Sequence, residues 1–292
     1  MTTGAIEAVD PIVQRLRALV QESPDLKDAA QLYETILPIL RDTDLRAGPV
    51  SISPDQAQAK MEMGLPLLYD LDLELDGQAA RKLMLQLARA LEIFGEKNQP
   101  LHTAARQIRL ALKENKFSIG DLLPYVAAGE SGLVTAAAQG LQLDAILMWT
   151  LAQNTLKPAM RAWRRQLTPL GAGDRWYKGR CFICGTTAVL AELQENTQVK
   201  HLRCGQCGAD WRFSRLQCMY CGNDDHNTLH CLYAESRREI MRVEVCDKCN
   251  GYLKVVSSFA PTPPEMLPVE DLATLHLDYI AQERGYARVM VQ

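Results

Sequence analysis

Four Cys-x-x-Cys pairs between residues 181 and 249 constrain this chain more than any other feature of its sequence. Two thiolates separated by two residues can face one ion across a tight turn, and a second pair completes a tetrahedral cage of four sulfurs. The spacing therefore predicts bound metal ions, each held by four cysteines. The candidate ligands are eight of the nine cysteines: Cys181, Cys184, Cys204, Cys207, Cys218, Cys221, Cys246 and Cys249.

The residues that follow the pairs support this interpretation. Gly185, Gly208 and Gly222 come directly after the first three pairs, and Asn250 and Gly251 come after the fourth. All are residue types that tolerate positive φ. A chain that curls past an ion needs that conformation so that its backbone N–H groups face the sulfurs.

The lengths of the intervals predict which pairs share an ion. The first two pairs enclose residues 185–203, and the last two enclose residues 222–245. Either interval suits a ribbon of two or three strands, whereas residues 208–217 form only a short connector. We expect sequential pairing and two ribbons in tandem. A crossed arrangement, with the outer pairs on one ion and the inner pairs on the other, stays open because the cost of closing a longer loop grows slowly.

Composition narrows the class of protein. With 292 residues, 47% of them hydrophobic, the chain can bury a sizeable core in two or three domains. The first residues show no export signal, and the most apolar run, from Leu141 to Ala152, is interrupted by Asp144. We therefore expect no membrane span and a cytoplasmic location. Thiols in that compartment serve metal binding more often than structural disulfides.

Residues 1–170 contain no cysteine and predict an all-α domain. Ser23-Pro24 and Ser53-Pro54 are typical helix starts. Around residues 68–76 the apolar period changes to two, which indicates a short extended segment with a solvated acidic edge. The helical patterns begin with Ile6, Val9, Ile12, Val13, Leu16 and Val20, and continue over a helix opened at Asp76-Gly77 and over Leu101–Leu112, Ile119–Ala127 and Leu141–Trp163.

The second half alternates cysteine pairs with segments of strand character. After Pro261 we expect an extended linker, and then a helix over Val269–Glu283 that Gly285 caps. The predicted fold is α+β and multidomain: an all-α domain (1–170), two tandem zinc-ribbon-like β modules (171–215 and 216–260), and a linker with a C-terminal helix (261–292). The strands are expected at Ala188–Leu193, Val199–Leu202, Trp211–Leu216, Leu229–Tyr233, Ile240–Val245 and Tyr252–Ser257.

Other candidate residues carry weaker signals. Cys231 lies in a strand pattern, and we expect it to be a buried structural cysteine. His201 and His226 are near the pairs, but eight well-spaced thiols leave little need for them as ligands. No hydrolytic, transfer or phosphate-binding motif is present. Four thiolates leave no open coordination position, so no catalytic residue is predicted.

Two alternatives remain open from the residues alone. An iron ion in such a cage could change valence, which would make the protein an electron carrier. A nucleic-acid adaptor is the other, but residues 171–260 hold 12 Lys and Arg against 10 Asp and Glu. That balance is too even for an electrostatic footprint, so no nucleic-acid partner is expected.

From about Trp176 to Ala287 the sequence resembles the formate dehydrogenase accessory protein FdhE family. The resemblance rests on four motifs, and the first pair, Cys181-Phe182-Ile183-Cys184, departs from the family only in lacking a proline. The motifs are Cys204-Gly-Gln-Cys207 before Asp210-Trp211, Cys246-Asp-Lys-Cys249-Asn-Gly-Tyr-Leu-Lys254, Glu270-Asp271-Leu272-Ala273 and Glu283-Arg-Gly-Tyr-Ala287.

The resemblance implies a cytoplasmic, non-enzymatic maturation factor. Family members are needed for the activity of respiratory formate dehydrogenase, so the implied partner is the catalytic subunit of that enzyme. The family's metal sites are rubredoxin-like and associated with iron. Iron and zinc both accept four thiolates in a tetrahedron, and the preference for iron over zinc rests on the resemblance alone.

Overall fold

The chain folds into helices, then a sheet, then helices again, as predicted. The computed structural model describes residues 10–43, 45, 47–194, 198–234 and 240–289. Ile6 and Val9, which belong to the first helical pattern, lie outside these ranges. The α-helices before the sheet are α1 (Pro11–Glu22), α2 (Lys27–Asp42), α3 (Pro54–Met63), α4 (Gly77–Phe94), α5 (Gln99–Lys113), α6 (Ile119–Ala128), α7 (Ser131–Gly140) and α8 (Ala145–Leu167). Those after it are α9 (Leu267–Ala273) and α10 (Leu275–Glu283).

The polar residues at the helix starts explain most of these bounds. Ser53 and Gln56 form a capping box on α3, because each side chain accepts a hydrogen bond from the other residue's backbone N–H. The Asp76 carboxylate caps α4 by accepting from the N–H groups of Gln78 and Ala79. Ser23 makes no such cap, because Pro24–Leu26 form a 3₁₀ turn that leads into α2.

Two predicted helices have different bounds in the structure. The helix predicted over Leu141–Trp163 begins only at Ala145, because Gln142 has a φ of +55° and Asp144 supplies the N-cap. The single C-terminal helix predicted over Val269–Glu283 is wrong. Thr274 interrupts it, and its hydroxyl donates to the carbonyl of Glu270. Gly285 follows α10 with a φ of +86°, in the position expected of a C-terminal cap.

The strands lie in a single six-stranded sheet of order β3-β2-β1-β6-β5-β4. Each ribbon contributes three antiparallel strands, and the parallel pair β1–β6 joins the two ribbons along Ala191–Gln194 and Val255–Ser258. Pairing β1 with β6 covers an edge that each ribbon would otherwise expose. The strands are β1 (Ala188–Gln194), β2 (Val199–Cys204), β3 (Asp210–Arg212), β4 (Leu229–Leu232), β5 (Met241–Cys246) and β6 (Gly251–Ser258).

One buried core runs from the helices into the first ribbon. Trp163 of α8 and Trp211 of β3 are both nearly inaccessible to solvent and belong to the same apolar cluster, together with Cys181 and Cys204. A smaller cluster packs α10 against the second ribbon through Val243, Tyr252 and Leu277. The domain boundaries at residues 170, 215 and 260 stay a prediction, since the packing is continuous across the first of them.

The segment after α3 contacts the first ribbon. The N–H groups of Leu67 and Leu68 donate to the carbonyls of Phe182 and Ile183, at 2.7 and 2.9 Å. Farther on, Leu75 bridges to Ala47. Of the segment predicted to be extended around residues 68–76, residues 68–70 form a turn beside the first cysteine cluster, and the acidic residues Asp72 and Glu74 in the remainder are exposed.

The linker after β6 crosses back over the first ribbon. Arg203 and Glu192, both almost completely buried, form an ion pair inside the sheet. The Arg203 guanidinium also donates to the carbonyl of Thr262, and the N–H of Thr262 donates to the Glu192 carboxylate at 3.2 Å. The buried pair therefore fixes the start of the linker as well as the spacing of β1 and β2.

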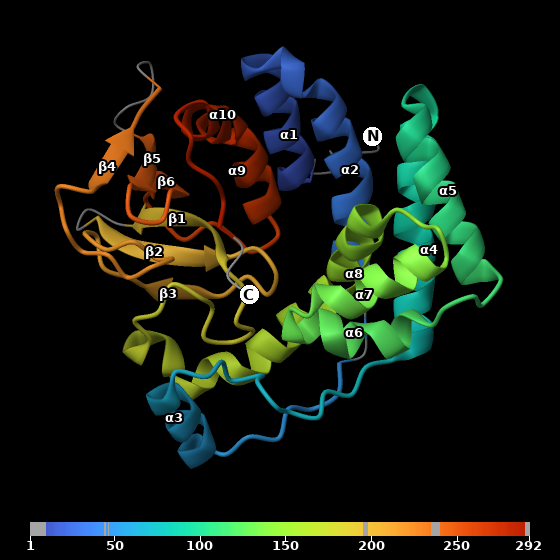
Figure 1. The fold of residues 1–292 in the computed structure, drawn as a ribbon, viewed down its shortest axis with the longest axis horizontal. Helices are drawn as coiled ribbons and strands as arrows, with labels where there is room; N and C mark the ends of the chain where they lie inside the picture. Colours follow the sequence, from blue (N-terminus) through green and yellow to red (C-terminus); the bar gives the residue numbers. More distant parts are fainter. Residues whose placement is uncertain (1–9, 44, 46, 195–197, 235–239, 290–292) are drawn as a thin grey trace, which may run out of the picture.

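The C-terminal helices lie between the sheet and α1 (Figure 1). A buried ion cluster holds them there. Lys254 of β6 pairs with Asp271 and Asp278, each at 2.7 Å, and Arg288 pairs with the same two carboxylates. On the far side of α9, Glu270 pairs with Arg15 of α1 at 3.2 Å. Two of the motifs that carry the family resemblance, those with Lys254 and Asp271, thus meet in one cluster.

We expect Lys254→Met to destabilise the protein by about 3 kcal/mol, because it leaves two carboxylates with only Arg288 to balance them. Arg284→Met, which removes an exposed cation just beyond α10, is the matched control and should change stability by less than about 0.5 kcal/mol. Urea denaturation measures both variants. Equal stability of the two would show that the buried cluster does not hold α9 and α10.

Candidate metal centres

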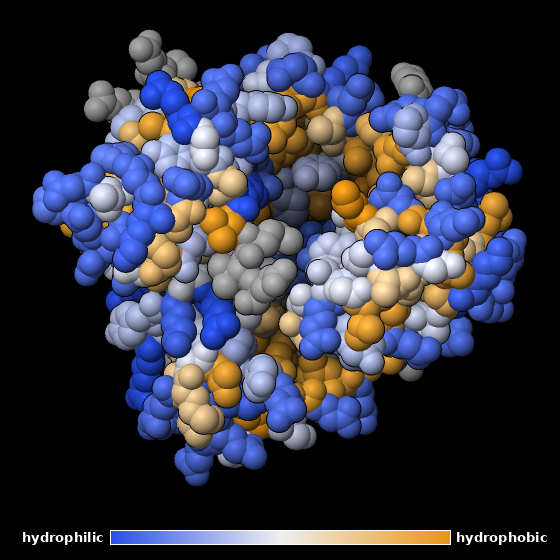
Figure 2. Space-filling view, in the orientation of Figure 1, coloured by the Kyte–Doolittle hydropathy of each residue, from blue (hydrophilic) through white to orange (hydrophobic). Residues whose placement is uncertain are grey.

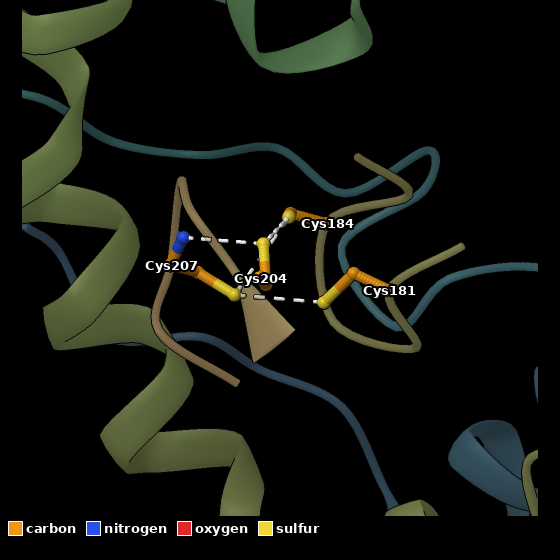
Figure 3. A group of neighbouring side chains, drawn as sticks. All are labelled: Cys181, Cys184, Cys204 and Cys207. Atoms are coloured by element: carbon orange, nitrogen blue, oxygen red, sulfur yellow. Dashed lines mark hydrogen bonds between the residues drawn. The ribbon is translucent and has the colours of Figure 1, made fainter. Parts of the chain in front are cut away.

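The first two cysteine pairs converge on one point, with their four sulfur atoms facing one another (Figure 3). The Sγ atoms of Cys181 and Cys207 are 3.5 Å apart, as are those of Cys184 and Cys204. Cys181 and Cys184 come from the turn before β1, whereas Cys204 ends β2 and Cys207 lies in the turn after it. The pairs are therefore grouped in sequence order, as predicted, and not in the crossed arrangement.

The last two pairs form a second cluster of the same kind. The Sγ atoms of Cys218 and Cys249 are 3.6 Å apart, and those of Cys221 and Cys246 are 3.8 Å apart. Cys246 ends β5, and Cys249 lies in the tight turn that leads into β6. All eight candidate ligands of the sequence are thus brought into two groups of four, each with its sulfurs within 4.8 Å of one another.

These distances fit a tetrahedral ion. With metal–sulfur bonds of about 2.3 Å, the edge of an S₄ tetrahedron is about 3.8 Å. The observed sulfur separations of 3.5 to 3.8 Å match that edge, and they are far longer than the roughly 2.05 Å of a disulfide bond. Each cluster could therefore hold one metal ion through four thiolates. The geometry is equally suitable for iron and for zinc.

The turns around the sulfurs repeat one design. In the first three pairs the glycine after the second cysteine has a φ of +73 to +77°, and its N–H donates to the carbonyl of the pair's first cysteine. At the fourth pair Asn250 has a φ of +53°, the positive φ that the sequence predicted there. Backbone N–H groups also point at the sulfurs: that of Ile183 lies 3.4 Å from Cys181 Sγ, and that of Cys207 lies 3.4 Å from Cys204 Sγ.

The surroundings of the sulfurs set their protonation. Burial raises the pKa of Cys181 and Cys207, whereas hydrogen bonds from the neighbouring thiols lower the pKa of Cys204. Burial also opposes ionisation of Cys246, yet hydrogen bonds from the Cys249 N–H and the Asn223 amide lower its pKa to about 7. Each cluster thus contains a thiol whose ionisation is favoured, which is the form that a metal ion binds.

The first cluster is enclosed. Cys181, Cys204 and Cys207 have no exposed surface, and Cys184 is half-buried. Beside them, Lys157 and Arg161 stand one turn apart on α8. Burial lowers the pKa of both groups, and the nearby Cys204 and Cys207 act against this effect on Lys157 and Arg161 respectively. Burial and Arg161 outweigh the opposing effect of Cys204 and lower the pKa of Lys157 to about 8. Four thiolates around a divalent ion carry a net charge of about −2, which these two cations would offset.

The second cluster lies at the surface. Cys221 is exposed and Cys249 is half-buried. The side-chain amide of Asn223 donates to Cys246 Sγ at 3.5 Å and to the Thr228 hydroxyl at 2.8 Å. The C-terminal segment also contacts this cluster. The Tyr286 hydroxyl donates a hydrogen bond to the carboxylate of Asp247, the residue after Cys246, at 2.6 Å. The two clusters therefore share a ligand set but differ in access to solvent.

Three other residues considered from the sequence lie outside both clusters. Cys231 is exposed on β4, so the prediction of a buried cysteine is wrong; β4 forms the edge of the sheet. His201 pairs with Asp210 inside the first ribbon, and His226 is exposed. Asn223 and Lys157 were not singled out from the sequence. Asn223 could have been predicted from its position, because it is a polar residue directly after the glycine that follows a cysteine pair.

Comparison with known proteins gives matches to a family model, to curated proteins and to a solved structure. Residues 216–292 match the family described as "FdhE, C-terminal domain". The Protein FdhE homolog of Aquifex aeolicus is 29% identical over 119 residues, and that of Haemophilus influenzae (strain PittEE) is 32% identical over 111 residues. The crystal structure of the FdhE protein from Pseudomonas aeruginosa aligns with a TM-score of 0.63 at 23% identity, covering 96% of this chain and 93% of that one. The resemblance to the FdhE family is confirmed.

The matches cover different lengths of the chain. The aligned stretches span 40% of this chain and 41% of the Aquifex FdhE homolog, and 37% and 35% for the Haemophilus one. Similarity to the Pseudomonas FdhE structure extends over the helical half as well, and at that identity it shows a shared fold. Within the part of the chain that the structure describes, no helix combines the length and apolar character needed to cross a membrane.

Gly208→Ala and Gly222→Ala should distinguish the cost of backbone strain from the cost of steric overlap in the turns that follow the cysteine pairs. Both glycines have a similar positive φ, so each substitution should cost about 1–2 kcal/mol. A Cβ at residue 208 would also lie 2.4 Å from Pro264 Cβ, whereas one at residue 222 meets nothing within 4 Å. We expect Gly208→Ala to be the more destabilising by about 1–3 kcal/mol in urea denaturation. Equal costs would mean that the linker does not press on the first cluster.

Cys204→Ser and Cys221→Ser should differ in what they unfold. Both should lower the metal content by one ion per chain, as measured by elemental analysis, because three thiolates close a site poorly. Cys204→Ser should also expose residues 64–76 to proteases, since the carbonyls that hold Leu67 and Leu68 belong to the first cluster's turn. Cys221→Ser should leave that segment protected. Equal protection of the segment in both variants would contradict this coupling.

Proposed function

We propose that each cysteine cluster binds one metal ion through its four thiolates. The ligands would be Cys181, Cys184, Cys204 and Cys207 in the first site, and Cys218, Cys221, Cys246 and Cys249 in the second. The sulfur separations, the N–H groups that face the sulfurs and the cations beside the first cluster support this assignment. The resemblance to the FdhE family favours iron, with zinc as the alternative.

We propose further that the protein is a cytoplasmic, non-enzymatic accessory protein for the maturation of respiratory formate dehydrogenase. In this role it would bind the enzyme's catalytic subunit through a surface that the two metal sites brace. The observation that carries the proposal is that both clusters are closed by four sulfurs, which leaves no position for a reacting molecule. Nine cysteines without a disulfide among them are compatible with a reducing compartment.

The bracing role has a structural basis. The first cluster belongs to the same buried core as the helices, and the second ribbon is joined to the C-terminal helices by the Lys254 ion cluster. Metal at both sites would hold the ribbons at a fixed angle to the helices. A maturation factor needs such a preformed surface because ordering it during binding would reduce the affinity.

Affinity capture tests the client assignment. Tagged, metal-loaded protein should retain the catalytic subunit of formate dehydrogenase when the two are co-expressed, and deletion of the protein should lower formate dehydrogenase activity. The Cys204→Ser variant should capture less of the subunit, because its first ribbon is no longer fixed. A wild-type protein that ignores the catalytic subunit, with both metal sites filled, would refute this function.

An electron carrier is the second candidate, and the exposure of Cys221 favours it. An iron ion in the second cluster would lie close to the surface, where a redox partner could approach. This alternative predicts a visible thiolate-to-iron absorption band that bleaches reversibly on reduction. It also predicts that Cys221→Ser abolishes the second site's share of the band together with the electron transfer.

A further inference from the structure

A second feature lies in the helical half, well separated in sequence from the cysteine clusters. The helices α2, α4 and α5 pack side by side, with α4 in contact with both neighbours (Figure 1). Residues of all three helices line an open groove of about 1120 Å³. Along α4 the groove extends from Gln78 to Ile93, which corresponds to about 22 Å of helix.

The charge of this groove is one-sided. Its lining contains five cations and no carboxylate: Arg81, Lys82, Arg89, Arg109 and Lys113. Behind the lining, Glu92 pairs with Arg109 and Arg89 at 2.6 and 3.0 Å. None of the carboxylates that the structure describes pairs with the other three. A cluster of this kind in a chain of net charge −3 creates a local positive field that attracts anionic groups.

Apolar side chains also form part of the groove lining. Leu85 and Ile93 are two turns apart on the same face of α4, and Ile39 faces them from α2. The side chain of Ile93 is 51% exposed, and Leu85 and Ile39 are half-buried. On the face drawn in Figure 2, hydrophobic residues reach the surface at several places over the helical half.

We propose that this groove binds an acidic amphipathic helix of a partner protein. The apolar stripe of such a helix would cover Leu85 and Ile93, and carboxylates on either side of the stripe would meet Lys82 and Lys113. A helix of about four turns fills the 22 Å of the groove. Laying an amphipathic helix in a groove between helices is a recurrent mode of peptide recognition.

The exposed Ile93 and the half-buried Leu85 distinguish this occupant from other anions. A nucleic acid would bring phosphates to the cations but would leave Ile93 in contact with water or with a polar backbone. The aromatic side chains on which single-stranded bases stack are missing from the residues that line the groove. An anionic membrane would need a convex face, since a flat bilayer cannot reach the floor of a groove between two helices.

A synthetic peptide of about 16 residues tests the proposal, with leucines at helical spacing on one face and glutamates beside them. Fluorescence anisotropy should show saturable binding to the full-length, metal-loaded protein, and the binding should weaken as salt is added. Lys82→Glu with Lys113→Glu should weaken binding at least tenfold, and Ile93→Glu should weaken it comparably. All three residues are exposed, so the variants should keep the fold.

Arg106→Glu with Arg212→Glu is the matched control. Both cations are exposed, one on α5 and one on β3, and neither lines the groove. This variant should bind the peptide within about twofold of the wild type, because it makes the same change in net charge outside the site. The peptide with lysine in place of glutamate should not bind.

Three results would overturn the proposal. They are the lack of saturable peptide binding up to about 1 mM, an equal loss of affinity in the control variant, and tighter binding of a DNA duplex or a phosphatidylglycerol vesicle than of the peptide at the same salt concentration. The inference does not depend on formate dehydrogenase being the partner. Capture of its catalytic subunit by a Lys82→Glu, Lys113→Glu variant would leave the proposed function standing and place that contact elsewhere.

Discussion

The gathering of four thiols inside a closed cluster is the interaction on which the rest of this structure depends. Thiols held 3.5 to 3.7 Å apart in a site with almost no exposed surface, as in the first cluster, gain little from one another. A cation at their centre converts the same arrangement into one of the strongest local interactions that a small β module can have. The turns, the glycines with positive φ and the inward N–H groups all serve this arrangement.

The local parts of both clusters could be predicted from the sequence because they are encoded within a few residues. A Cys-x-x-Cys-Gly segment specifies its own turn, and the spacing between pairs specifies a ribbon. Gly185, Gly208 and Gly222 have the backbone conformation expected of them, and so does Asn250. The strands follow from β-branched and aromatic runs between the pairs. At the cysteine clusters prediction succeeded because the determining residues are close together in sequence, whereas the local signal at Ser23 did not produce a cap and the single helix predicted over Val269–Glu283 is broken at Thr274.

The non-local parts could not be predicted in this way. The parallel pairing of β1 with β6 joins residues about 64 positions apart. The hydrophobic periodicity of a strand does not indicate which other strand it pairs with. The same holds for the backbone of Leu67 and Leu68, which closes the wall of the first cluster from the helical half. Cys231 shows the opposite error: a strand pattern was taken to mean burial, although an edge strand such as β4 leaves one side open.

The two clusters differ in burial and in the helices that they contact, so a change in each cluster affects a different part of the fold. The first lies between α8, the linker and the segment after α3, so a change there reaches the helices. The second contacts the C-terminal segment through Asp247 and Tyr286, and its ribbon contacts α9 and α10 through the ion cluster around Lys254, so a change there reaches these helices. Met219, in the turn between Cys218 and Cys221, also belongs to the large core. Since α9 in turn pairs with α1 through Glu270 and Arg15, both clusters act on the position of the same helical half. The basic groove lies on that half, lined by helices that contribute no residue to either cysteine cluster, and its shape is set by the packing of α4 against α2 and α5. A partner that engages the groove therefore meets a surface shaped by helix packing, while any contact it makes with the ribbons depends on the two cysteine clusters.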